Sequence, residues 1–386
     1  MTSNLLVPFT KDRFGYYNVG QFKIYSKIEA IELQLKTGIH PEWHFNDEEF
    51  SQYDWTVEPD IAIDELYAMR ARQIRDNYDY IVLFYSSGAD STNILNTFLR
   101  HNISFEEIAS LCVEKGDGGK DTHFNQEIFS RALPNTLRIC DSNLGVKHRL
   151  IDMTEITAKM YDSPAAKFDF LYDNNCMFSP NNRARAYLRE YVDEYKDIID
   201  SGRRLCFVWG CDKPRIFQQD GKLNVRFLDV IDGATGAIAK IQRLNRSWEH
   251  DELFYWSPDL PQLIIKQAHL IMKYLKTTIP TSADFTQTGP NKSFGSIEYR
   301  GDTFYLRDHA VHRILYGINE FHTVKPSSTF FSERDTWFLK NPDHIESARN
   351  YMQGIDKLRS IVPEYWVNGT FDRGIKGCMS KPYWLE

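Results

Sequence analysis

Hydroxyl, glycine and acidic side chains gather in one short stretch of the chain, Ser86-Ser87-Gly88-Ala89-Asp90-Ser91-Thr92. An apolar run precedes this stretch, and a segment with helical spacing follows it. Backbone N–H groups are free at the start of a helix, and the helix dipole places partial positive charge there. Because the hydroxyl groups of Ser86, Ser91 and Thr92 converge on the same small volume, the stretch predicts a site for a phosphate group.

The familiar phosphate-loop motifs do not describe this site. A Walker A loop needs the pattern GxxxxGK[ST], and the only similar segment lies at residues 114–121. In that segment Glu114 stands where glycine is required, and Asp121 stands where serine or threonine would bind magnesium. We interpret residues 114–121 as a loop that could close over a nucleotide. A Rossmann GxGxxG pattern is also absent from the sequence.

The stretch SSGADST resembles the PP-loop, SGGxDS, of the ATP pyrophosphatase superfamily, whose members are adenine nucleotide alpha hydrolase-like. It is nearest in character to the synthetase domain of asparagine synthetases. Ser86, Gly88, Asp90 and Ser91 match the motif, while Ser87 replaces its first glycine. The resemblance covers about residues 75 to 235. It implies that residues 86–92, Ala89 and Thr92 included, bind ATP, which is split into AMP and pyrophosphate.

An acidic residue inside a phosphate loop points to a metal ion. The carboxylate of Asp90 would repel pyrophosphate, whereas Mg²⁺ between the carboxylate and the phosphate oxygens reverses the sign of that interaction. We therefore expect ATP and Mg²⁺ as the cofactors, with Asp90 as a catalytic residue and metal ligand.

A second cluster, Trp209-Gly210-Cys211-Asp212-Lys213-Pro214-Arg215, follows a later apolar run. It resembles the glycine-plus-acid element with which several superfamily members complete the metal and pyrophosphate site. The resemblance makes Gly210 and Asp212 nucleotide-binding residues and Asp212 a second magnesium ligand. Lys213 and Arg215 would neutralise phosphate charge as catalytic residues. An ordinary turn with a surface ion pair is the alternative interpretation.

The elements that position these clusters follow from an alternating pattern. Continuous apolar runs alternate with helical patterns, which predicts an α/β fold with a doubly wound parallel sheet and helices on both faces. The resemblance makes this sheet HUP-like. Ligands bind at the carboxyl ends of such strands, where both clusters lie. We expect strands at 81–85, 108–113, 148–153 and 205–210, and helices near 59–78, 91–101, 121–133 and 181–200.

We expect the chain to consist of three regions, with the alternating strands and helices in the middle one. Residues 1–58 read as an appendage with one helix near 28–35, and residues 59–245 as the PP-loop domain. Residues 246–386 read as a mostly helical region, with helices at about 261–275 and 342–361, that would specify the substrate. Two further groups of residues are candidates for a binding site. Asn181, Asn182, Arg183 and Arg185 could hold substrate or simply begin a helix, and His309 and His312 lack a third metal ligand in the sequence.

Composition limits the class of protein. The chain has 386 residues, 42% of them hydrophobic, and a formal net charge of −7. These values are those of a globular protein and give no support to nucleic-acid binding. No signal peptide or membrane-spanning run is visible, so we expect a cytoplasmic protein without a membrane partner. Six cysteines occur without a CxxC pair, so no zinc or iron–sulfur site is indicated.

Three functions fit these features. The first is an ATP-dependent adenylating enzyme, a ligase or synthetase, that activates a carboxylate, amide or base oxygen for attack by a nitrogen nucleophile. No cysteine follows Met1, so the nitrogen would come from ammonia, an amine or a separate donor subunit. The second is sulfur transfer to a nucleic-acid base through an adenylated intermediate, with Cys112, Cys176 or Cys211 as the reactive thiol. The third is a non-catalytic nucleotide-binding module, because Ser87 departs from the motif.

Overall fold

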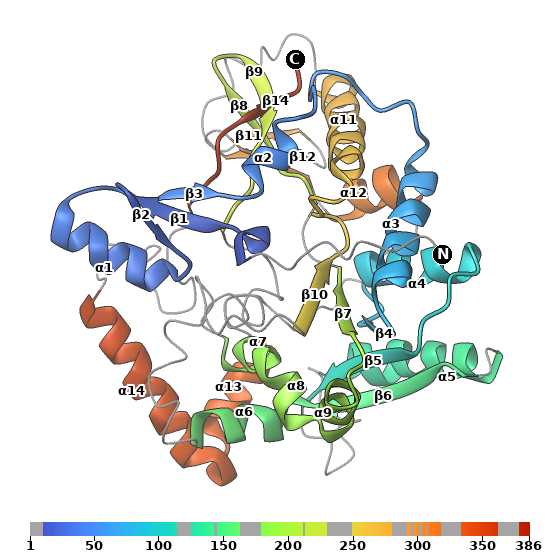
Figure 1. The fold of residues 1–386 in the computed structure, drawn as a ribbon, viewed down its shortest axis with the longest axis vertical. Coiled ribbons are helices and arrows are strands. Elements are labelled where there is room, and N and C mark those ends of the chain that lie inside the picture. The colour runs from blue at the N-terminus through green and yellow to red at the C-terminus, as the bar shows by residue number, and fades with distance from the viewer. Residues whose placement is uncertain are drawn as a thin grey trace.

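A five-stranded sheet in which all strands are parallel, flanked by helices, forms the core of the chain (Figure 1). This computed structural model describes residues 11–113, 125–142, 145–162, 179–210, 213–229, 249–279, 292–294, 297–300, 303–306, 308–317, 333–361 and 378–386. The strand order is β10 (Glu249–Leu253), β7 (Leu205–Trp209), β4 (Tyr80–Phe84), β5 (Glu107–Cys112) and β6 (Lys147–Asp152). The predicted α/β class and its parallel sheet are thus confirmed.

The four predicted strands are present because their residues are suited to burial on both faces of a sheet. All five residues of β7, sequence LCFVW, are buried, and so are four of the five in β4. The edge strand β10 was not predicted and lies in the range assigned to the C-terminal region. Its sequence, EHDEL, has no apolar run. Its Asp251 and Glu252 are nevertheless buried, and each pairs with arginine.

The helix after β4 forms where the sequence predicted it. In α4 (Ala89–Arg100), the side chains of Ile94, Leu95 and Phe98 recur at helical spacing and are buried. The predicted helix at 181–200 is broken into short pieces, and α6 was not predicted. The other elements around the sheet are α3 (Ile63–Asn77), η3 (Ile128–Ala132), α5 (Leu133–Ser142), α6 (Met153–Asp162), α7 (Pro180–Ala184), η6 (Arg185–Tyr187), α8 (Leu188–Tyr191) and α9 (Asp193–Asp200).

A second, six-stranded sheet continues the chain after the second cluster, and the sequence did not predict it. Its order is β11 (Lys292–Phe294), β12 (Ile297–Arg300), β13 (Thr303–Leu306), β8 (Ile216–Gln219), β9 (Lys222–Val225) and β14 (Tyr383–Trp384). Strands β8 and β9 form a hairpin around Asp220 and Gly221, which have φ angles of 51° and 77°. An Asp-Gly pair between two strands is typical of this turn, so the pair was the signal that could have predicted the hairpin.

The C-terminal region is helical, as predicted, apart from β10 and the strands that it adds to the second sheet. It contains α11 (Pro261–Thr278), α12 (Asp308–Tyr316), α13 (Glu333–Lys340), η7 (Pro342–His344) and α14 (Ile345–Ile361). Helix α12 packs against both α11 and α4, which brings its last residue near the start of α4. Among the helices that the structure describes, none is both long and apolar enough to cross a membrane.

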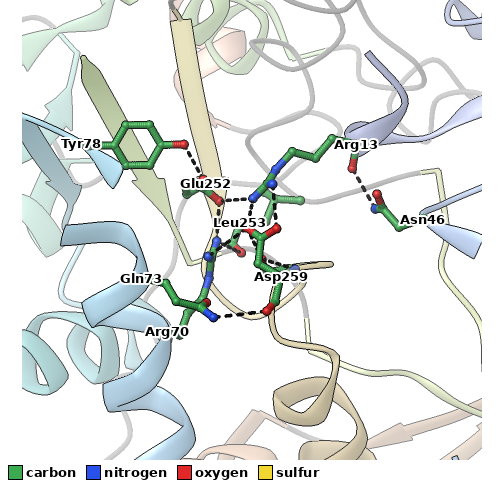
Figure 2. Close-up of polar contacts among 9 residues, drawn as sticks. Arg13, Asn46, Arg70, Gln73, Tyr78, Glu252, Leu253 and Asp259 are labelled. Carbon is green, nitrogen blue, oxygen red and sulfur yellow. Dashed lines mark hydrogen bonds and ion pairs between the residues drawn. The ribbon is translucent and has the colours of Figure 1, made fainter. Parts of the chain in front are cut away.

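The N-terminal segment folds as a small antiparallel unit. It contains η1 (Lys11–Phe14), β1 (Tyr16–Val19), β2 (Phe22–Ile24), α1 (Lys27–Thr37), β3 (Glu42–His44) and α2 (Asp47–Phe50). A partly buried ion cluster joins this unit to the central sheet (Figure 2). Arg13 Nη2 lies 2.9 Å from Glu252 and 2.6 Å from Asp259, and Arg70 of α3 also pairs with Glu252. Two guanidinium groups thus face two carboxylates, so the cluster is electrically balanced and ties three segments together.

Candidate functional site

The strand order places a change of direction in the sheet between β4 and β7. From β4 the chain proceeds outward through β5 and β6, then returns to the other side of β4 to form β7 and β10. In open parallel sheets, ligands bind outside the carboxyl ends of the strands where the order reverses in this way. The predicted clusters at 86–92 and 210–215 follow β4 and β7 respectively. The fold therefore brings both to the position where such sheets bind ligands.

The loop after β4 is built as a cradle of short hydrogen-bonding groups. Ser91 Oγ donates to the carbonyl of Gly88 at 3.0 Å and accepts from the N–H of Ser86 at 3.4 Å. Ser86 Oγ accepts from the N–H of Gly88 at 3.4 Å. The first N–H groups of α4, at residues 89–91, have no hydrogen-bond partner within the described part of the chain. Backbone N–H groups at the start of a helix are able to bind an anion.

Ser87 adopts a backbone conformation that favours glycine. Its φ angle is 62°, in the left-handed region, where a Cβ atom costs roughly 1–2 kcal/mol. Its Oγ atom is buried and has no hydrogen-bond partner in the described structure. A glycine at this position would adopt the same backbone conformation without that cost. The serine keeps that geometry with added strain, of the kind found at functional sites.

Asp90 and Lys213 form the contact that joins the two clusters. Lys213 Nζ lies 2.9 Å from Oδ1 and 3.1 Å from Oδ2 of Asp90. Gly210 lies close to Asp90. A Cβ atom added to Gly210 would come within 3.3 Å of Asp90 Cβ and 3.1 Å of Ile94 Cδ1. A Cβ atom at 210 would therefore make unusually tight contacts with Asp90 and Ile94. The role of Gly210 is thus close approach between the end of β7 and the start of α4.

Two tyrosines, which sequence reasoning missed, hold Asp90 from the other side. Tyr316 Oη, at the end of α12, donates to Asp90 Oδ1 at 2.6 Å, and Tyr255 Oη donates to the Asp90 carbonyl at 2.9 Å. Burial, with the charge of Asp90, raises the pKa of Tyr316 well above its usual value, so its hydroxyl stays protonated and donates. The tyrosines lie 226 and 165 residues from Asp90 in sequence, and no local pattern marks them.

The environment of Asp90 keeps its carboxyl group ionised. Burial alone would raise the pKa of this carboxyl, but the charge of Lys213 and the hydrogen bonds from Tyr316 and Lys213 lower it below its usual value. His312, one turn before Tyr316 and stacked on its ring, acts in the same direction. An ionised carboxylate that is about a quarter exposed can serve as a ligand for a cation.

The other residues predicted to belong to the site do not all lie within the described part of the chain. Arg215 is half-buried and directly precedes the first residue of β8 in the chain. Asn181 is buried and donates to Asp335 Oδ1 at 3.0 Å, so its contacts are structural. Cys112 is fully buried, and its thiol lies 3.5 Å from the carbonyl of Ile151. The loop at 114–121, Cys176, Cys211, Asp212 and the side chains of Arg183 and His309 lie outside the described residues.

Within the described ranges, no group of three or more histidine, cysteine or acidic side chains is arranged to hold a metal ion. Magnesium in nucleotide sites is usually held by one or two carboxylates together with substrate phosphates. Asp90 by itself supplies the one carboxylate that such a site needs. No protein-family model, curated protein or solved structure matches this chain.

Proposed function

We propose that the chain is an ATP-dependent adenylating enzyme, with a HUP-like PP-loop domain, that converts ATP to AMP and pyrophosphate. The observation that carries the proposal is the convergence of two loops on Asp90. The loop at 86–92 supplies free N–H groups and hydroxyls, and Lys213 arrives from the next strand with a positive charge 2.9 Å from the carboxylate. The two loops meet where doubly wound sheets bind nucleotides.

The residues present fit magnesium-bound phosphate. Asp90 is ionised and about a quarter exposed, so a cation can reach it. The buried hydroxyl of Ser87 and the N–H groups at residues 89–91 offer donors for phosphate oxygens. Mg²⁺ bound there would offset the negative charge of the phosphates. The PP-loop resemblance assigns Asp212 as a second ligand and Arg215 as a second phosphate-neutralising group.

In the proposed reaction, an oxygen of the acceptor attacks the α phosphorus of ATP. The bond between the α phosphorus and the bridging oxygen of the β phosphate breaks, and pyrophosphate leaves. The chain's part is to hold the β and γ phosphates in the cradle and to stabilise the charge that grows on the leaving group, with Lys213 as the main cation. A nitrogen nucleophile then displaces AMP from the adenylate.

None of the four cysteines that the structure describes is exposed, and Cys176 and Cys211, two of the thiols named for the sulfur-transfer alternative, lie outside the described residues. Cys112 and Cys206 are fully buried, and burial raises the pKa of the Cys206 thiol well above its usual value. A reactive thiol needs the opposite environment, exposed and with a lowered pKa. The proposed nucleophile is nitrogen, delivered as ammonia, as an amine or by a separate subunit.

The reaction can be tested with ATP labelled at the α phosphate. The purified chain is incubated with this ATP, Mg²⁺ and sets of carboxylate, amide and nucleobase acceptors, and the products are separated. We expect labelled AMP and an equal amount of pyrophosphate with one acceptor class. Incorporation of labelled pyrophosphate into ATP, without a nitrogen nucleophile, would identify a reversible adenylation step. Formation of ADP alone, or no product with any acceptor, would exclude the proposed reaction.

A further inference from the structure

The ammonium group of Lys213 lies between the two carboxylate oxygens of Asp90. Its Nζ atom is 2.9 Å from Oδ1 and 3.1 Å from Oδ2, so it contacts both oxygens almost equally. A carboxylate that binds a cation through both of its oxygens holds that cation in the same place, between them. Lys213 thus occupies a position on Asp90 that suits a bound cation.

The hydroxyl group of Tyr316 uses a further part of the same carboxylate. It donates to Oδ1 of Asp90 at 2.6 Å. An ionised carboxylate offers about four lone-pair sites, and Lys213 and Tyr316 together take up most of them. A divalent cation on the remaining oxygen site would lie close to the ammonium group of Lys213. Because the two positive charges would repel each other, Lys213 in this position opposes the binding of a metal ion.

Asp90 is held more firmly than Lys213 is. Its backbone carbonyl accepts a hydrogen bond at 2.9 Å from Tyr255, whose hydroxyl group accepts another at 3.1 Å from Asn93. Tyr255 is fully buried, and its ring stacks on that of Tyr316 at 5.6 Å. The side chain of Lys213 is 20% exposed, and a lysine carries its charge on a flexible four-carbon stem. If the pair separates, Lys213 is therefore the partner that moves.

We propose that Lys213 is a resident countercharge for Asp90, which leaves the carboxylate for the phosphates when ATP arrives with its magnesium ion. A metal ion alone would displace the ammonium group without offering it another anion. An ion that arrives on ATP brings phosphate oxygens to which the ammonium group can turn. This inference rests on the proposed function, and it adds that metal and nucleotide enter the site together.

The test measures metal binding and needs no turnover. The full chain is titrated with Mn²⁺ in place of Mg²⁺, and the free ion is counted by electron paramagnetic resonance. The titration is repeated with α,β-methylene-ATP, an ATP analogue that cannot be split at the α–β position. Lys213→Gln and Lys213→Met remove the charge, and Lys213→Arg keeps it. Arg204→Gln is the control, because Arg204 pairs with Asp79 at the opposite ends of β4 and β7.

Without nucleotide, Lys213→Gln and Lys213→Met should bind Mn²⁺ about tenfold or more tightly than the wild-type chain, because the competing positive charge is gone. Lys213→Arg and Arg204→Gln should match the wild-type chain. Adding Asp90→Asn to Lys213→Gln should remove the gain, which places the ion at Asp90. Both uncharged variants should bind the ATP analogue more weakly, so the two effects have opposite signs. Equal affinity for Mn²⁺ alone in the wild-type chain and both uncharged variants would overturn the proposal.

The same titrations separate this inference from the proposed function. If Lys213→Gln gains affinity for Mn²⁺ but neither it nor the wild-type chain binds the analogue, the proposed function fails and the exclusion of a metal ion by Lys213 remains. If the wild-type chain binds the analogue with Mn²⁺ and Lys213→Gln gains no affinity for Mn²⁺ alone, the countercharge role fails and the proposed function remains.

Discussion

Lys213 Nζ lies 2.9 Å from Asp90 Oδ1, although 123 residues separate the two in sequence. This ion pair joins the chain after β4 to the chain after β7. The opposite ends of the same two strands carry a second pair, in which Arg204 Nη2 lies 2.9 Å from Asp79 Oδ1. Each pair thus joins an aspartate next to β4 to a basic residue next to β7. The two pairs lie at opposite ends of these strands.

Replacing Asp90 by Asn should abolish release of AMP and pyrophosphate. The amide keeps the shape of the side chain but removes the negative charge that holds Mg²⁺, so we expect turnover to fall at least about 100-fold. The measurement is the labelled-ATP assay. Asp79→Asn is the control and should retain turnover, since it breaks the pair at the far edge. Equal activity in the two variants would show that Asp90 is not a magnesium ligand.

Replacing Lys213 by Gln should slow the reaction by roughly 10- to 100-fold, because the variant loses a cation that stabilises charge on the leaving pyrophosphate. The variant should be compared with Arg204→Gln in steady-state kinetics of pyrophosphate release. If Lys213 acts mainly on the leaving group, kcat falls more than KM rises. Kinetics of Lys213→Gln that match those of Arg204→Gln would restrict Lys213 to a structural role.

Replacing Ser87 by Gly should stabilise the chain. Glycine adopts the φ angle of 62° at that position without strain, so the free energy of unfolding should rise by about 1 kcal/mol. Denaturant titration of Ser87→Gly and Ser87→Ala provides the measurement. Alanine keeps the strained Cβ and should give no such gain. An equal gain in both variants would attribute the effect to the buried hydroxyl instead of to the backbone.

The same two variants test what the hydroxyl of Ser87 contributes to phosphate binding. If the buried Oγ atom donates to a phosphate, both variants should bind the ATP analogue more weakly than the wild-type chain does. If backbone N–H groups alone form the cradle, Ser87→Gly should bind at least as tightly as the wild-type chain. Calorimetric titration with Mg²⁺ and α,β-methylene-ATP distinguishes the two outcomes.

Replacing Glu252 by Gln should destabilise the chain in a pH-dependent way. Burial opposes ionisation of Glu252, but Arg13, Arg70 and Tyr78 outweigh it and lower its pKa from 4.5 to about 2. Because the folded-state pKa is the lower one, the stabilisation is fully present above the unfolded-state value and is lost as pH falls through about 2. At pH 7 the variant should lose about 3 kcal/mol of unfolding free energy.

The difference between Glu252→Gln and the wild-type chain should therefore shrink between about pH 5 and pH 2. Unfolding free energies at several pH values provide the measurement. Glu346→Gln removes an exposed carboxylate that pairs with Arg349, and it should show little loss at any pH. A loss in Glu252→Gln that stays constant with pH would mean that Glu252 is not held ionised by the two arginines.

The limits of pattern reading are clearest in β10. Its residues Glu249, His250, Asp251 and Glu252 are all polar, so neither an apolar run nor an alternating pattern marks a strand. Burial of its carboxylates depends on Arg70 and Arg189, which lie on other elements far away in sequence. Such long-range charge pairing leaves no local signal. The hairpin of β8 and β9, by contrast, has a local signal. The Asp220-Gly221 pair at its turn is sufficient to predict it, although the sequence analysis did not.

The sequence by itself determined the parallel sheet, the loop at 86–92 and its meeting with the 210–215 cluster at one edge. The physical reason is local, because apolar runs specify buried strands and the carboxyl ends of parallel strands lie together. Only the tertiary structure decided that β4 and β7 are neighbours and that Asp90 pairs with Lys213 and Tyr316. Those contacts depend on how distant elements pack, which residue spacing does not specify.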